Sequence, residues 1–102
     1  IHVFDISRLI AKILLRGYVN HIWNLVDILP SSREHYLIEL AKLKNIKKYN
    51  LVHYKDEQKY LKKITKTYWQ NNKRVSNLKV TKEVNQQLLF PNYKAGLKNL
   101  LS

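Results

Sequence analysis

One short run in the second half of the chain combines three kinds of side chain that bind nucleic acids. Tyr68-Trp69-Gln70-Asn71-Asn72-Lys73-Arg74 places aromatic, amide and cationic groups next to one another. Amide side chains pair with adenine edges, cations bind phosphates, and an exposed indole stacks on an unpaired base. The candidate contacts from this run are Trp69, Gln70, Asn71, Lys73 and Arg74. Trp69 is alternatively expected in the core. For Tyr68, which continues the apolar stripe of the helix, a core position is favoured more strongly.

A lysine-rich segment precedes this run and extends the candidate interface. Its lysines fall away from an apolar stripe of Tyr60, Leu61, Ile64 and Tyr68. The spacing predicts one helix that Asp56 caps and that fades near residues 71–72. The additional candidate phosphate contacts are Lys59, Lys62, Lys63 and Lys66. Because the chain has 15 lysines and 4 arginines, we expect phosphate contacts to outweigh base-specific reading, for which Arg is better suited.

The charge of the chain is divided unevenly along its length. The net charge is +12, from 19 basic and 7 acidic residues. Residues 1–41 carry four residues of each sign, so the whole excess lies in residues 42–102. Such an asymmetry favours an N-terminal part that packs or binds protein and a C-terminal part that meets a polyanion. The competing interpretation is a solvated lysine-rich face, or the Lys and Asn enrichment of an A/T-rich genome.

The residues that most often perform catalysis are scarce or badly spaced. There is no Cys, and His2, His21, His35 and His53 stand at no metal-ligand spacing. Gly17 and Gly96 stand alone, so no glycine-rich phosphate loop exists. We therefore expect a non-enzymatic binding protein with no catalytic residue, metal or cofactor. A minor alternative is a metal-independent RNase toxin domain in which His53 and Lys55 act as acid and base.

Helical periodicity runs through almost the entire sequence. It predicts one all-α domain over residues 1–102, a compact bundle of about five helices, with a short extended segment near residues 50–55. A first helix follows Asp5 as N-cap and ends at Gly17, and a second apolar set covers residues 19–29 before Pro30. Ser31 and Glu34 form a capping-box pattern for the next helix. Thr81 is the expected cap of a helix that Pro91 stops, and a last short helix holds Leu97, Leu100 and Leu101.

A protein-interaction domain is the main alternative function. In that interpretation the apolar helices of residues 5–29 dock a partner chain, with Trp23 as the anchor, since Trp is enriched among interface hot spots. The chain begins at Ile1 and contains no Met, which indicates a piece of a longer or processed polypeptide. No apolar run reaches the length of a membrane span. A DNA or RNA partner would favour a nuclear or nucleoid-type cytoplasmic location over secretion.

Overall fold

Six α-helices and one 3₁₀ turn form the structure, a computed structural model that describes all residues 1–102. The helices are α1 (Val3–Leu15), α2 (Arg33–Leu43), α3 (Tyr54–Glu57), α4 (Lys63–Gln70), α5 (Leu78–Val84) and α6 (Tyr93–Leu101), with the 3₁₀ turn η1 at Gln58–Tyr60. The all-helical class is confirmed, with six helices instead of about five. Residues 50–53 connect α2 to α3 without forming a strand.

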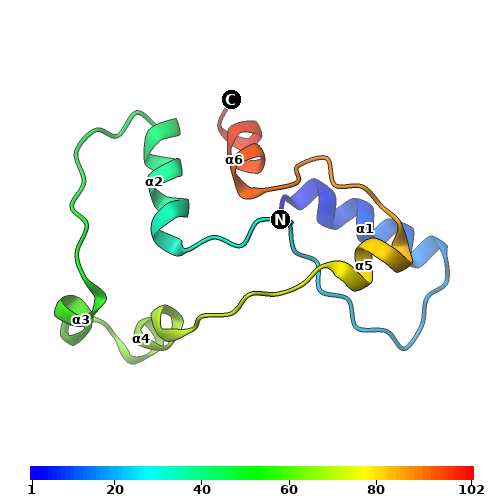
Figure 1. Ribbon diagram of the computed structural model, residues 1–102, viewed down its shortest axis with the longest axis horizontal. Helices are drawn as coiled ribbons and strands as arrows, with labels where there is room; N and C mark the ends of the chain where they lie inside the picture. The colour runs from blue at the N-terminus through cyan, green and yellow to red at the C-terminus, as the bar shows by residue number, and fades with distance from the viewer.

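The helices pack in pairs. α1 lies against α5, and α2 lies against α6, while α3 and α4 lie at the opposite end of the molecule from α1 and α5 (Figure 1). The molecule is flat, with extents of 49 × 33 × 18 Å and a radius of gyration of 16.9 Å. A closely packed domain of 100 residues has a radius of gyration of about 13 Å. The difference reflects the long connections between the helix pairs.

The core is small and sits between α1 and α5. Leu9, Val80 and Val84 are fully buried, and half-buried side chains from residues 18–25 pack against them. Leu9 reaches this core because the apolar residues of α1 recur every three or four positions, which places them on one face of the helix. Only 8 of the 102 residues are buried, so polar contacts must add to what apolar burial provides.

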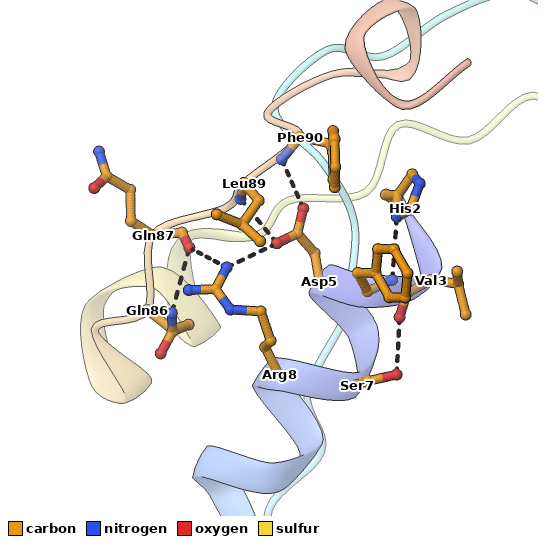
Figure 2. Close-up of polar contacts among 10 residues, drawn as sticks. His2, Val3, Asp5, Ser7, Arg8, Gln86, Gln87, Leu89 and Phe90 are labelled. Carbon is orange, nitrogen blue, oxygen red and sulfur yellow. Dashed lines mark hydrogen bonds and ion pairs between the residues drawn. The ribbon is translucent and has the colours of Figure 1, made fainter. Parts of the chain in front are cut away.

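The strongest of these polar contacts fastens α1 to the segment that precedes α6. The Asp5 carboxylate is 1% exposed and accepts hydrogen bonds from the backbone amides of Leu89 and Phe90, both at 2.8 Å. Arg8 donates to the same carboxylate at 3.1 Å and to the carbonyl of Gln87 at 3.2 Å (Figure 2). Desolvation of the buried carboxyl opposes its charged form. The hydrogen bonds from Leu89, Phe90 and Arg8 outweigh that effect and hold the pKa of Asp5 below its ordinary value of 3.8.

Two predicted helix starts in the first half of the chain are wrong. His2, not Asp5, caps α1, and its side chain accepts from the amide of Phe4. Asp5 lies in the first turn of α1, and its carboxylate accepts hydrogen bonds from the distant amides of Leu89 and Phe90 instead of capping the helix. Ser32, not Ser31, caps α2, and its hydroxyl accepts from the amide of His35 at 3.1 Å. The shift by one residue places His35 where a capping box needs Glu or Gln, so Glu34 has no capping role.

The predicted helix over residues 19–29 does not form. Gly17, with φ +69°, ends α1 as predicted, but residues 18–32 then follow an irregular path along the α1–α5 core. Trp23 packs against that core and stacks on His21, with ring centroids 5.1 Å apart. Lys79 lies over the Trp23 ring and donates to the carbonyl of Ile22. These tertiary contacts hold the segment without helical hydrogen bonds.

The predicted helices of the basic half are also shorter than expected. The predicted helix after Asp56 divides into α3, η1 and α4, because the chain turns to an extended conformation at Leu61 and Lys62. Its predicted cap, Asp56, lies inside α3, whose N-cap position is His53. The next helix, α5, starts after Asn77, so Thr81 lies inside it and is not its cap. It ends at Asn85, which takes the left-handed conformation with φ 50° well before Pro91. Asn adopts that conformation more readily than most residues do.

Candidate nucleic-acid interface

The six predicted phosphate contacts leave their charges free. None of their side chains donates a hydrogen bond or forms an ion pair within the protein; only Lys59 has a partner, the ring of Tyr60 at 5.0 Å. All are exposed except Lys66, which is half-buried. The six are Lys59 in η1, Lys62, Lys63 and Lys66 on α4 or at its start, and Lys73 and Arg74 in the connection to α5. Charges without a protein partner are available to an external anion.

The basic residues of the first 41 positions, by contrast, form hydrogen bonds within the protein. Arg8, Lys12 and Arg16 donate to backbone carbonyls of Gln87, Asn85 and Glu83. They therefore hold α1 against the end of α5 and the segment that follows it. These cations are engaged within the protein, whereas the six predicted phosphate contacts are not.

The spacing along α4 places its lysines and its tryptophan on one side. Lys62, Lys66 and Trp69 follow one another at intervals of four and three residues, which lie on the same face of a helix. Trp69 is 39% exposed and Gln70 and Asn71 are exposed beside it. The expectation of a core position for Trp69 is therefore wrong. No local pattern in the sequence indicates that the side of α4 that carries Trp69 lacks extensive contact with another helix.

The apolar stripe of α4 is exposed as well, contrary to expectation. Tyr68 is 59% exposed and Ile64 is 79% exposed. Both were expected in the core from their spacing, but no helix makes extensive contact with α4. Uncovered apolar surface is a common feature of binding sites, so two faces of α4 are open to a partner.

Arg33 is a residue of this region that the sequence did not indicate. As the first residue of α2, it donates to the backbone carbonyl of Trp69 at 3.2 Å. Its guanidinium carbon lies 4.0 Å from the centroid of the Tyr68 ring and 5.2 Å from that of Trp69. Arg33 thus joins the start of α2 to the end of α4 and adds a cation to the aromatic pair. Its position in the neutral part gave no signal of this role.

Hollows surround this junction. One of about 520 Å³ is lined by Ser31, Ser32, Arg33, Tyr36, Leu37, Tyr68 and Trp69. A neighbouring one of about 560 Å³ shares Arg33 and Trp69 with it and reaches Asn71, Asn72 and Lys73. A third hollow, of about 440 Å³, has Lys73 and Arg74 in its lining. The predicted residues Trp69, Asn71, Lys73 and Arg74 therefore come together with the start of α2. The other predicted residues, Gln70, Lys59, Lys62, Lys63 and Lys66, line none of these three hollows.

The remaining candidates do not assemble into another site. Trp23, the proposed anchor for a protein partner, is half-buried against the core. His53 is exposed at the start of α3 and its side chain makes no capping hydrogen bond. No group of three or more His, Cys, Asp or Glu side chains is placed to hold a metal ion. No helix combines the length and the apolar character that crossing a membrane requires.

No family model, curated protein or solved structure matches the chain.

Proposed function

We propose that the protein is a non-enzymatic nucleic-acid-binding domain that contacts phosphates through the basic segment around α4. The observation that carries the proposal is the run between Glu57 and Glu83, which contains eight basic residues and no acidic one. Seven of the eight have neither a hydrogen bond nor an ion pair within the protein, and the exception is Lys79. Self-repulsion among such charges destabilises the folded state, and a polyanion that neutralises them releases its own condensed counterions.

The shape of α4 supports contact with a backbone. Lys62 and Lys66 project from one face together with Trp69, so cations and an aromatic ring can follow the same strand. Lysine serves as a point charge on phosphate and is less suited than Arg to bidentate recognition of guanine. The proposed binding is accordingly weak in sequence preference.

The experiment compares equilibrium binding of labelled oligonucleotides by the parent chain and by two double variants. Lys62→Gln with Lys66→Gln removes two charges from α4, and Lys94→Gln with Lys98→Gln removes two exposed charges from α6. The proposal expects the α4 variant to bind all sequences more weakly and the α6 variant to bind nearly as the parent does. Arg8 and Lys12 are unsuitable controls, because both hold backbone carbonyls.

A protein-interaction domain is the second candidate, and one observation favours it. α1 exposes Phe4, Leu14 and Leu15, the last at 88%, on a helix whose other face packs on the core. Residues 19–29 form no helix and Trp23 packs on the core, so such a partner would dock on α1 and on exposed residues of that segment such as Val19 and Ile22. Absence of binding to any DNA or RNA near physiological salt would move this candidate into first place.

A further inference from the structure

The hollow between the start of α2 and the end of α4 has the composition of a base-binding site. Its walls include three exposed aromatic rings, from Tyr36, Tyr68 and Trp69. Its volume of about 520 Å³ lies within the range of about 300–1,000 Å³ that is usual for small-ligand sites. Aromatic walls of this kind stack on the face of any nucleobase.

Cations stand beside the aromatic walls. Arg33 lies over Tyr68 within the hollow itself, and a planar guanidinium stacks on bases as well as pairing with phosphates. Lys73 and Arg74 line the hollows that continue from it. The Tyr68 and Trp69 rings are nearly perpendicular, at 86°, and Arg33 covers Tyr68, so the base would stack on Trp69. A nucleotide in that position would have cations on the side toward which its phosphates continue.

Two acidic side chains limit where the phosphates can lie. Glu34 lines the middle hollow and Asp27 lines the third one. Asp27 lies 3.4 Å from the backbone nitrogen of Ile1, so part of its charge is already compensated. Glu34 has no such partner and repels a phosphate placed next to it.

We propose that this hollow takes an unpaired base of a single-stranded DNA or RNA, with the adjoining phosphates on Lys73 and Arg74. This inference rests on the proposed nucleic-acid binding and adds the class of strand to it. In a duplex the base faces are hidden by stacking. A duplex can therefore contact the lysines but cannot place a base in the hollow. The chain should therefore bind a single strand more tightly than a duplex of equal length.

The test uses fluorescence anisotropy at one salt concentration with an oligothymidylate, an oligouridylate of the same length and a duplex of that length. Trp69→Ala should weaken single-strand binding about 5- to 140-fold, which corresponds to the stacking energy of about 1–3 kcal/mol per base. Its effect on the duplex should be less than about twofold on the same reasoning, because a duplex offers no base face. Trp69→Phe, which keeps an aromatic ring, should recover most of the lost affinity. Comparing the affinities for the oligothymidylate and the oligouridylate shows whether the sugar contributes to binding.

Tyr60→Ala is the matched control, because Tyr60 is also an exposed aromatic residue beneath a cation but lies outside the hollow. A Trp23→Phe background leaves Trp69 as the one indole, and its fluorescence should be quenched by the single strands. If the parent chain binds single strand and duplex equally, and Trp69→Ala changes neither affinity, the proposed base-binding role of the hollow is wrong and the proposed function stands. An equal loss on both ligands would overturn it too, because Trp69 would then act only through the shape of α4. Failure of the parent chain to bind any of the three ligands would overturn both proposals.

Discussion

Arg33 donates a hydrogen bond to the backbone carbonyl of Trp69, 36 residues further along the chain. The same guanidinium covers the ring of Tyr68. No helix makes extensive contact with α4, and the bond from Arg33 is the one hydrogen bond that joins α4 to a distant part of the chain. The position of the predicted binding residues therefore depends on a single long side chain.

Replacing Arg33 should loosen α4. An exposed cation–π contact contributes about 0.5–1 kcal/mol, and the hydrogen bond adds to it. Arg33→Gln should therefore raise hydrogen exchange at the amides of α4 by about fivefold, the factor that corresponds to about 1 kcal/mol. Arg74→Gln removes the same charge from a side chain without a partner and should leave that exchange unchanged. Equal exchange in the two variants would contradict the role assigned to Arg33.

The cap of α2 gives a second test, in which two adjacent serines are compared. The Ser32 hydroxyl accepts from the amide of His35, whereas the Ser31 hydroxyl only donates to the carbonyl of Ser32. Ser32→Ala should cost about 0.5–2 kcal/mol of unfolding free energy, and Ser31→Ala much less. Urea denaturation of both variants measures the difference. A larger loss for Ser31→Ala would restore the capping box that the sequence suggested.

Asp5 makes the stability of the fold sensitive to acid. Because its pKa in the folded chain is below 3.8, the charged carboxylate stabilises the fold in full well above that pH. The contribution is lost as the pH falls through the folded pKa, since protonation removes the acceptor for Leu89 and Phe90. Asp5→Ala leaves these two amides without a partner, which costs about 2–3 kcal/mol at neutral pH.

The pH dependence separates Asp5 from the other carboxyls. Urea unfolding of the parent should show a steeper loss of stability below about pH 4 than Asp5→Ala does. Glu39→Ala, which removes a half-buried acid on α2 with no ion pair, should keep the parent's slope. Parallel curves for the parent and Asp5→Ala would show that the carboxylate does not hold the segment before α6.

Local signals in the sequence predicted the helices better than the contacts between them. The periodicity of Leu9 and Ile13 and the glycine at position 17 were sufficient for α1, because both act within a few residues. The cap at Asp5 was misassigned because its partners, Leu89 and Phe90, lie at the other end of the chain. The segment around Trp23 has helical spacing but is held by the core, which no local pattern reveals.

The candidate interface divides in the same way. The free lysines of α4 were predictable, since net charge and the lack of nearby acids are properties of the sequence alone. The exposure of Trp69 and Tyr68 was not predictable, because a stripe of helical spacing indicates a buried face unless no element covers it. Arg33 joins the site only through the fold, so no reasoning from residues 59–74 could have found it.

The salt dependence of duplex binding tests the central claim most directly. A duplex hides its base faces, so its affinity reports the phosphate contacts, each of which contributes about −0.9 to the slope of log affinity against log salt. Four to six contacts predict a slope of about −4 to −5 for the parent chain. Lys62→Gln with Lys66→Gln should reduce the slope by nearly two, and Lys94→Gln with Lys98→Gln should leave it almost unchanged. A slope near zero, or the same slope for the parent and the α4 variant, would contradict nucleic-acid binding through α4.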